Sequence, residues 1–251
     1  MSTARRIAST FGAAAPGYEA HAGAQAHAAR RLGERLTCLP LPEAPRILEL
    51  GCGTGLLTRL LLQLYPDARI LATDRAIEMV RAARVNLVAC DRVDFAVMDG
   101  ERLAMGGGFD LITANLAWQW FEDPLAAFAH CQSLLNPAGW IGITTLGEEN
   151  FAEWRGLCEQ NGLPHGLRAY PTRRDWQARL APTAMITEES YRCTYPSALE
   201  FLRALRAIGA QSPARGYRPQ SPGLMRRVLR GGEKGFVSSY HLLYIADQKP
   251  F

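Results

Sequence analysis

The chain has 251 residues, 48% of them hydrophobic and 21% charged, with a formal net charge of +4 at pH 7. This length can bury one good core, and the composition is that of an ordinary globular protein rather than of a disordered or fibrous one. The sequence contains no apolar run of about 18 residues, which excludes a membrane-spanning helix of that kind.

The chain opens with a segment of small apolar residues at helical spacing, over residues 3–38, which ends at the proline-rich stretch 40–45. From residue 46 onward, short apolar runs alternate with segments of helical period. Strands that alternate with helices predict an α/β fold with a parallel, doubly wound sheet and right-handed crossovers. We expect strands at 46–50, 69–74, 93–99, 109–115 and 140–146, and helices at 56–65, 76–86 and 124–135.

The pattern is weaker beyond residue 147. Residues 150–160 and 197–209 have helical spacing, and 210–223 is expected to form a loop rich in proline, glycine and arginine. Residues 236–248 alternate well enough to predict a strand, which we expect to lie antiparallel at the edge of the sheet.

A glycine turn follows the first predicted strand, in the sequence ILELGCGTG at residues 47–55. Glycine there lets the backbone approach a ligand closely before a helix begins. A dinucleotide site has the spacing G-x-G-x-x-G and holds a pyrophosphate. This turn instead places glycine at every second residue, Gly51, Gly53 and Gly55, with Glu49 ahead of them. A ligand that has an ammonium group and no phosphates fits this pattern, and S-adenosylmethionine has these properties.

Polar residues end the later strands as well. Asp74 lies about 20 residues beyond the glycine turn, where a carboxylate can bind the two ribose hydroxyls. Asp99, with Gly100 and Glu101, follows the third strand, where it can meet the adenine edge, and Asn115 ends the fourth strand. A single aspartate after a strand is more often a helix cap than a ligand, but polar residues at successive strand ends favour one binding site.

Together these motifs resemble the class I S-adenosylmethionine-dependent methyltransferases, through ELGCGTG at 49–55, Asp74, MDGERL at 98–103 and FDLITANLAWQW at 109–120. The resemblance implies a Rossmann-like α/β fold with a seven-stranded, mostly parallel sheet and an antiparallel last strand, an N-terminal helical lid and an inserted helical cap. It also implies S-adenosylmethionine as the cofactor, with S-adenosylhomocysteine as its product. The cofactor-binding residues that it implies are Glu49, Gly51, Cys52, Gly53, Gly55, Asp74, Arg75, Met79, Asp99, Gly100, Glu101, Asn115 and Leu116.

The flanking segments resemble a narrower family, the malonyl-acyl carrier protein O-methyltransferases of biotin synthesis. The similarity extends over nearly the whole chain, through segments 11–25, 115–120, 143–148, 204–210 and 239–246. It implies methylation of the free carboxylate of malonyl-acyl carrier protein, or of malonyl-coenzyme A, to give the methyl ester. A carboxyl methyltransferase of another small acid, of the trans-aconitate type, stays open because it shares the cofactor-binding half.

The family resemblance implies one methyltransferase domain over 1–251. It divides into a helical lid at 1–40, a cofactor-binding core at 45–146, a cap that binds substrate and partner at 147–235, and a terminal strand at 236–251. A nucleic-acid methyltransferase is disfavoured because NLAWQW follows the fourth strand, where a D/N-P-P-Y/F motif would be expected. A nucleotide-dependent oxidoreductase is disfavoured by the glycine spacing.

The expected reaction needs little acid–base chemistry from the protein. A carboxylate with a pKa of about 4 is already ionised at pH 7, so no general base is required. Catalysis would depend on alignment and on the exclusion of water. Tyr18 is the main candidate for a hydroxyl that faces the site. Gln119, between Trp118 and Trp120, is a candidate to orient the carboxylate or the cofactor, although both tryptophans would equally fit a core position.

A buried arginine would distinguish malonyl from acetyl through a bidentate pair with the carboxylate, and one well-placed arginine is expected to be enough. The candidates are Arg155, Arg203 and Arg206. Further residues expected to face substrate or to close the site are Phe11, His21, Trp120, Thr144, Thr145 and His241.

The charge is unevenly distributed along the chain. Residues 45–146 carry 8 arginines against 11 acidic residues, a net charge of −3. Residues 165–234 carry 12 arginines and one lysine against 5 acidic residues, a net charge of +8. We expect this basic segment to dock an acidic acyl carrier protein bearing malonyl-phosphopantetheine, although a solvated surface would show the same pattern. The docking candidates are Arg215, Arg218, Arg226, Arg227 and Arg230, with Arg203 and Arg206.

The six cysteines lack metal-type spacing, and the first residues lack the apolar core of a secretion signal. We therefore expect reduced thiols, a cytoplasmic location and no bound metal, with neither nucleic acid nor a membrane as a partner. A monomer is the simplest expectation for the oligomeric state.

Overall fold

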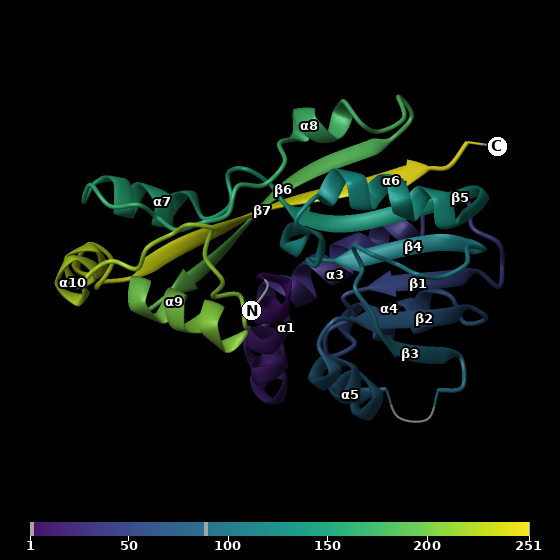
Figure 1. The fold of residues 1–251 in the computed structure, drawn as a ribbon, viewed down its shortest axis with the longest axis horizontal. Coiled ribbons are helices and arrows are strands. Elements are labelled where there is room, and N and C mark those ends of the chain that lie inside the picture. Colours follow the sequence, from purple (N-terminus) through teal and green to yellow (C-terminus); the bar gives the residue numbers. More distant parts are fainter. Residues whose placement is uncertain (1–2, 88–89, 251) are drawn as a thin grey trace.

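The computed structural model describes residues 3–87 and 90–250. Its centre is a seven-stranded sheet in the order β3-β2-β1-β4-β5-β7-β6 (Figure 1). β7 runs antiparallel to both of its neighbours and the other pairs are parallel, which confirms the expected α/β fold with one reversed strand. The strands are β1 (Arg46–Leu50), β2 (Arg69–Asp74), β3 (Val93–Val97), β4 (Phe109–Asn115), β5 (Leu135–Leu146), β6 (Met185–Tyr195) and β7 (Phe236–Gln248).

Helices cover both faces of the sheet. Along β1, Ile47 belongs to the hydrophobic core that includes α3 and α4, whereas Leu48 and Leu50 belong to the core formed with α6. This alternation follows from the two-residue period of a strand and divides the core into two layers. The helices are α1 (Thr3–Ala14), α2 (Tyr18–His21), α3 (Gly23–Leu36), α4 (Leu56–Leu64), α5 (Ile77–Asn86), α6 (Pro124–Leu134), α7 (Ala152–Glu159), α8 (Arg173–Gln177), α9 (Ala198–Ala207) and α10 (Pro222–Arg230), with short 3₁₀ turns η1 (Ala15–Gly17) and η2 (Trp118–Trp120).

The sheet contains one strand that the sequence did not reveal, β6, and this strand changes the place of β7. β7 lies between β5 and β6, so our expectation that it forms the sheet edge was wrong. No residue of β6 is buried, because β6 is an edge strand that pairs only with β7. Its hydrophobic signal is short and was missed: Tyr191, Cys193 and Tyr195 alternate with exposed residues and pack half-buried against the core. Part of the expected 147–235 cap therefore belongs to the sheet.

Three other boundaries differ from expectation. The N-terminal helical segment is interrupted at Pro16 and Gly17, which form η1 between α1 and α2. α10 begins at Pro222, inside the segment expected to be a loop, and Ser221 caps it by accepting a hydrogen bond from the backbone of its first turn. β5 begins at Leu135 rather than at residue 140. For β5 and the N-terminal segment the core of the element was predicted and its end was not, whereas no helix was predicted at α10.

Candidate active site

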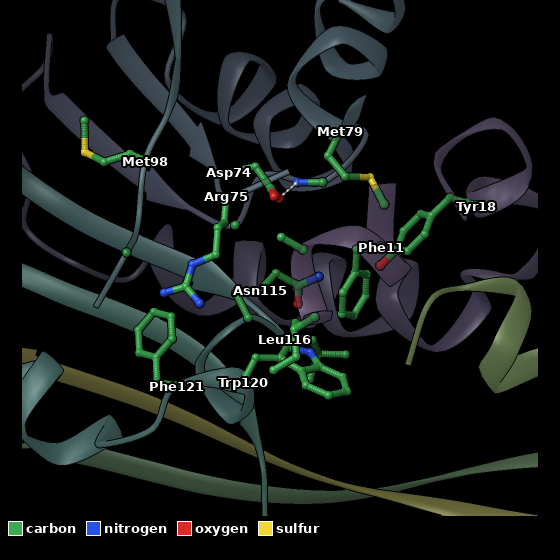
Figure 2. A pocket seen from close by; sticks show the side chains of 16 residues that line it. Phe11, Tyr18, Asp74, Arg75, Met79, Met98, Asn115, Leu116, Trp120 and Phe121 are labelled. Atoms are coloured by element: carbon green, nitrogen blue, oxygen red, sulfur yellow. Dashed lines mark hydrogen bonds between the residues drawn. The ribbon is translucent and has the colours of Figure 1, made fainter. Parts of the chain in front are cut away.

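A cavity, the sheet-end cavity, opens beyond the carboxyl ends of β1, β2 and β4, where an open parallel sheet binds its ligands. It encloses about 720 Å³ together with its mouth. The N-terminal segment forms one wall through Phe11 and Tyr18, and the strand ends form another through Gly51, Asp74 and Asn115 (Figure 2). Apolar side chains complete the walls, among them Met79, Met98, Leu116 and Phe121.

The glycine turn brings the backbone against this cavity. Gly51, Gly53 and Gly55 all have positive φ angles, of 69°, 55° and 91°. A Cβ atom on Gly51 would lie 2.4 Å from the Cβ of Ala117, so a side chain there would collide with the segment after β4. The backbone conformation and this close approach together explain why position 51 requires glycine.

Asp74 holds the glycine turn with both of its carboxylate oxygens. Oδ2 accepts a hydrogen bond from Gly53 N at 3.0 Å, and Oδ1 accepts one from Ala76 N at 2.8 Å. Figure 2 shows Asp74 in the wall of the cavity. Burial raises the pKa of Asp74, while these backbone hydrogen bonds and the Arg75 guanidinium act in the opposite direction. Because each oxygen keeps a further lone pair, the carboxylate can still accept hydroxyl groups of a ligand.

Arg75 and Asp99 form an ion pair beside the cavity. Asp99 also accepts a hydrogen bond from Glu101 N at 3.1 Å, and Glu101 accepts one from Asp123 N at 2.6 Å, where α6 begins. The structure thus places Arg75 and Gly100 in the cavity wall, whereas Asp99 and Glu101 hold the loop behind them.

A second cavity, the small cavity, encloses about 280 Å³ and continues from the first along the glycine turn. Glu49 lines it, is 1% exposed, and accepts a hydrogen bond from Thr58 Oγ1 at 2.6 Å. Burial raises the pKa of Glu49 to about 7, the Thr58 hydrogen bond acts in the opposite direction, and Asp74 adds to the increase. Cys52 lines the same cavity, and burial raises the pKa of its thiol well above its usual value. The thiol therefore stays protonated at neutral pH.

Two buried acceptor atoms at the small cavity have no hydrogen-bond partner. Asn115 Nδ2 donates to Gln25 O at 3.0 Å, which orients the amide and leaves Asn115 Oδ1 unpartnered. Gln25 Oε1 is also buried and unpartnered, and both residues line the cavity. Buried polar atoms in proteins are normally hydrogen-bonded. The pair therefore predicts a ligand with N–H donors, such as an ammonium group.

No sequence motif singled out Gln25. It lies on the buried face of α3, 9% exposed, among apolar neighbours such as Ala24, Ala28 and Leu32. Glutamine is uncommon at such positions unless it is hydrogen-bonded. A polar residue on an otherwise apolar helix face is the sequence signal that would have identified it.

Glu19 attaches the N-terminal segment to the glycine turn and to the helices beside it. Its Oε1 accepts hydrogen bonds from Thr54 Oγ1 and Asn86 Nδ2, each at 3.1 Å, and pairs with Arg59 at 3.2 Å. The neighbouring Tyr18 is half-buried and lines both cavities. Burial, with the Asp74 carboxylate, raises the pKa of Tyr18, so its phenol stays protonated and can donate a hydrogen bond.

An apolar chamber of about 440 Å³ adjoins the sheet-end cavity. The two share walls formed by Phe11, Tyr18, Leu116 and Trp120. Phe11 and Trp120 meet edge to face at this junction, with ring centroids 5.2 Å apart. The rest of the chamber is built mainly from Leu146, Phe151, Tyr170, Leu205, Ile208 and Tyr240. A group that enters it meets mainly hydrocarbon and aromatic surface, with the amides of Gln25 and Gln119 among it.

Gln119 also lines the chamber, as a candidate site residue should. Its Nε2 donates to Leu116 O at 2.6 Å, and its Oε1 is buried without a partner. The free atom is thus an acceptor, which suits an N–H donor better than it suits a carboxylate.

Other predicted residues lie outside the walls of these three cavities. Trp118 is 0% exposed, packs against Phe128, and donates a hydrogen bond from Nε1 to Pro124 O at 2.8 Å. It therefore occupies a core position, the alternative that the sequence left open. Thr144 and Thr145 are buried within β5. The sequence could not separate Trp118 from its neighbour Trp120, because η2 turns their side chains to different sides.

The two predicted histidines make local contacts. His21 is exposed, and its Nδ1 lies 3.2 Å from Gly17 O. His241 on β7 accepts a hydrogen bond from Glu149 N at 3.2 Å and lies 3.5 Å from Glu188. The structure brings neither of them into the sheet-end cavity or the chamber.

The predicted arginines are divided among three environments. Arg155 donates to two backbone carbonyls of the segment before α7, at 2.6 and 3.3 Å. Arg203 is exposed on α9 and pairs with Glu200. Arg206 lines an outer cavity next to the chamber. The docking candidates Arg215, Arg218, Arg226, Arg227 and Arg230 are all exposed.

Within residues 3–87 and 90–250, no group of three or more histidine, cysteine, aspartate or glutamate side chains is placed to hold a metal ion. The same part of the chain has no helix with the length and apolar character needed to cross a membrane. The six cysteines are free thiols.

The reversed strand in the sheet, the close glycine turn and the acid at the end of β2 define a class I S-adenosylmethionine-dependent methyltransferase. The family model for a methyltransferase domain matches residues 47–139. The YcgJ protein of Bacillus subtilis has a similar structure, with a TM-score of 0.61 and 15% identity over 88% of this chain and 99% of that one. The plantazolicin methyltransferase BpumL, solved with S-adenosylhomocysteine, has a TM-score of 0.51 and 17% identity over 98% of this chain and 90% of that one. At these identities the likeness shows the fold alone.

Relatives at higher identity narrow the class. The malonyl-acyl carrier protein O-methyltransferase of Magnetococcus marinus is 42% identical over 246 residues, which are 95% of this chain and 90% of that protein. The biotin biosynthesis bifunctional protein BioCD of Bordetella avium is 42% identical over 98% of this chain, which spans 53% of that longer protein. The chain belongs to the malonyl-acyl carrier protein O-methyltransferase family, and its cofactor is S-adenosylmethionine. Both sequence resemblances are thereby confirmed.

Proposed function

We propose that the chain transfers a methyl group from S-adenosylmethionine to the free carboxylate of malonyl-acyl carrier protein, as a step of biotin synthesis. The products are the methyl ester of the malonyl thioester and S-adenosylhomocysteine. Relatives that match most of the chain are named for this activity. The structural observation that supports it best is the junction of the sheet-end cavity with an apolar chamber, across Phe11, Tyr18 and Trp120.

The residues around the glycine turn fit the cofactor. In this proposal Asp74 accepts hydrogen bonds from the ribose hydroxyls. Asn115 Oδ1 and Gln25 Oε1, which have no partner, would accept hydrogen bonds from the ammonium group. Ionised Glu49 would add a negative charge beside that ammonium. When bound, the cofactor supplies a methyl group on a positively charged sulfonium.

The side chains between the two cavities account for the rest of the mechanism. The malonyl carboxylate is already ionised, so the protein has no proton to remove. The protonated Tyr18 hydroxyl donates a hydrogen bond to one carboxylate oxygen and leaves the other free to attack. Phe11 and Trp120 exclude water from the junction. With the cofactor bound, this dry junction would disfavour the separated carboxylate and sulfonium charges more than the less charged transition state.

The direct test supplies purified protein with S-adenosylmethionine and malonyl-acyl carrier protein. Mass spectrometry should find one added CH₂ on the malonyl group, together with S-adenosylhomocysteine. Acetyl-acyl carrier protein and free trans-aconitate serve as controls and should remain unmodified. Methylation of trans-aconitate without reaction of the malonyl thioester would overturn the proposal.

The carrier protein is proposed to dock on the basic segment. Arg226, Arg227 and Arg230 are exposed on α10, and Arg215 and Arg218 are exposed in the preceding loop. Complementary charge mainly accelerates encounter and fixes the orientation of the partner. The KM for malonyl-acyl carrier protein should therefore rise with salt concentration, because salt screens charges on exposed surfaces.

We further propose the division into a lid at 1–40, a core at 45–146, a cap at 147–235 and a terminal strand at 236–251, with β6 added to the sheet. Residues 1–2, 88–89 and 251 of these ranges lie outside the described residues. The chain is proposed to act as a monomer in the cytoplasm, without nucleic acid or membrane as a partner. Sedimentation of the purified protein and fractionation of cells test these two statements.

A further inference from the structure

The apolar chamber continues into a third space, the outer cavity, which encloses about 920 Å³ together with its mouth. Chamber and outer cavity share walls formed by Trp120, Phe151, Tyr170, Leu205 and Ala210. Since the chamber also shares walls with the sheet-end cavity, the three spaces follow one another from the glycine turn outward.

The outer cavity lies among the elements of the basic segment. Trp154 of α7, Leu202 and Arg206 of α9, and Met225 of α10 line it, together with parts of the loops at 165–170 and 210–217. Figure 1 shows α7, α9 and α10 grouped at the same end of the β6–β7 pair. A molecule that enters through the outer cavity therefore approaches from the side expected to dock the carrier protein.

Unpartnered polar atoms lie along this route. Gln119 Oε1 in the chamber and Ser212 Oγ in the outer cavity are buried and have no hydrogen-bond partner. A purely hydrocarbon ligand would leave both atoms unsatisfied, which is unfavourable for buried polar atoms. An extended ligand that carries amide groups between apolar stretches would satisfy them.

A free cation lies near the outer end. Among the residues that the structure describes, Arg206 is exposed, lines the outer cavity, and has neither a hydrogen bond nor an ion pair from its guanidinium. Arg168 in the same cavity is engaged, since it donates to Phe121 O at 3.4 Å and lies over the Trp120 ring. Arg203, on the same helix as Arg206, is paired with Glu200.

We propose that the three spaces form the route of the phosphopantetheine arm, with the phosphate bound by Arg206, the amides near Ser212 and Gln119, and the malonyl group in the apolar chamber. This inference rests on the proposed function and assigns Arg206 to the arm rather than to the substrate carboxylate. The chemical groups of the arm follow the same order as the residues along the route. The arm has a phosphate at one end, amides along its length and the acyl group at the other end.

Two small substrates that differ by one phosphate test the Arg206 assignment without any carrier protein: malonyl-phosphopantetheine and malonyl-pantetheine. Wild type should have the higher kcat/KM for the phosphorylated compound. Arg206→Ala should reduce this preference by about three- to fivefold, the effect of one exposed charge pair. Arg203→Ala, a matched loss of charge on α9, should leave the preference unchanged. Equal losses on both compounds in Arg206→Ala would overturn the phosphate site.

A second variant tests the path itself. Ala210 lines both the chamber and the outer cavity, so Ala210→Phe should narrow their junction. It should lower kcat/KM for both thioesters by about tenfold, the effect of a moderately overfilled site, while S-adenosylhomocysteine binds as in wild type. Unchanged turnover of both compounds in a variant that binds S-adenosylhomocysteine normally would overturn the route.

Failure of the proposed function would be distinguishable, because wild type would then methylate neither thioester. Binding of phosphopantetheine itself still tests the route in that case. Trp120 and Trp154 line it, so binding should quench tryptophan fluorescence. Wild type and Arg203→Ala should show this quenching, Arg206→Ala should bind more weakly, and absence of quenching in wild type would overturn the inference.

Discussion

Glu49 is a buried acid whose ionisation changes within the physiological pH range. Its pKa is raised from 4.5 to about 7, so between these values the folded, ligand-free chain keeps a proton that the unfolded chain has lost. The free energy of unfolding should therefore fall as the pH rises through this window, by on the order of 3 kcal/mol. The variant Glu49→Gln has no ionisable group at this position, so its free energy of unfolding should not fall with pH for this reason. Urea unfolding should find the variant more stable than wild type at pH 8 and nearly equal to it at pH 5.

The same substitution should weaken cofactor binding, because it removes the negative charge beside the ammonium group. Calorimetry should find a larger loss of S-adenosylmethionine affinity at pH 8, where Glu49 of wild type is ionised, than at pH 6. A stability difference between variant and wild type that is the same at both ends of the pH range would show that Glu49 does not titrate there.

Gln25 provides a second test at the residue scale. If its unpartnered Oε1 accepts a hydrogen bond from the ammonium group, Gln25→Ala should weaken S-adenosylhomocysteine binding by about tenfold or more, as for a hydrogen bond to a charged group. 5′-Methylthioadenosine lacks the amino-acid part of the cofactor and should bind both proteins equally. Similar losses for the two ligands would mean that Gln25 supports the cavity as a whole.

The N-terminal segment is the element that connects both ligand sites, and Glu19 joins it to the glycine turn. Glu19→Ala removes contacts to Thr54, Arg59 and Asn86. If the N-terminal segment is closed for a smaller fraction of the time in the variant, the apparent affinity for ligand falls in proportion. S-adenosylhomocysteine should therefore bind to the variant about three- to tenfold more weakly than to wild type. Deuterium exchange of residues 4–22 should accelerate.

Glu34→Ala is the control for this element. Glu34 is exposed on α3 and pairs with Arg31 of the same helix, away from the glycine turn. It should change neither the affinity nor the exchange rate. If Glu19→Ala binds S-adenosylhomocysteine like this control, the segment is held by its apolar contacts alone.

The elements that the sequence predicted share a physical property. β1, β2 and β4 are strongly buried, so their apolar runs identify them, and the glycine turn is constrained by its own backbone geometry. β6 has no fully buried residue, and the short alternation of Tyr191, Cys193 and Tyr195 was too weak to identify it. Gln25 and Glu19 were missed for a related reason. Their contacts arise when the N-terminal segment packs on the glycine turn, and no local motif records that packing.

At the scale of the whole molecule, the two proposed ligand sites lie in regions of different charge. The sheet-end and small cavities are built largely on residues 45–146, which carry a net charge of −3, and they would receive a cationic cofactor. The outer cavity is built largely within the basic segment, residues 165–234, with a net charge of +8. A complementary field raises the local concentration of each ligand at its own site. We expect this separation to direct an acidic carrier protein away from the acidic half as well.

The last prediction tests this separation by reversing charge on α10. Arg226→Glu with Arg227→Glu should raise the KM for malonyl-acyl carrier protein by about tenfold at low salt, because rim charges mainly govern encounter, while kcat stays close to that of wild type. The KM for malonyl-pantetheine should change little, since that substrate makes no contact with the rim. Arg30→Glu with Arg81→Glu applies the same charge change to exposed positions of α3 and α5, and should affect neither substrate. High salt should bring the α10 variant and wild type closer together. Equal losses on both substrates would show that the α10 substitutions damage the outer cavity rather than docking.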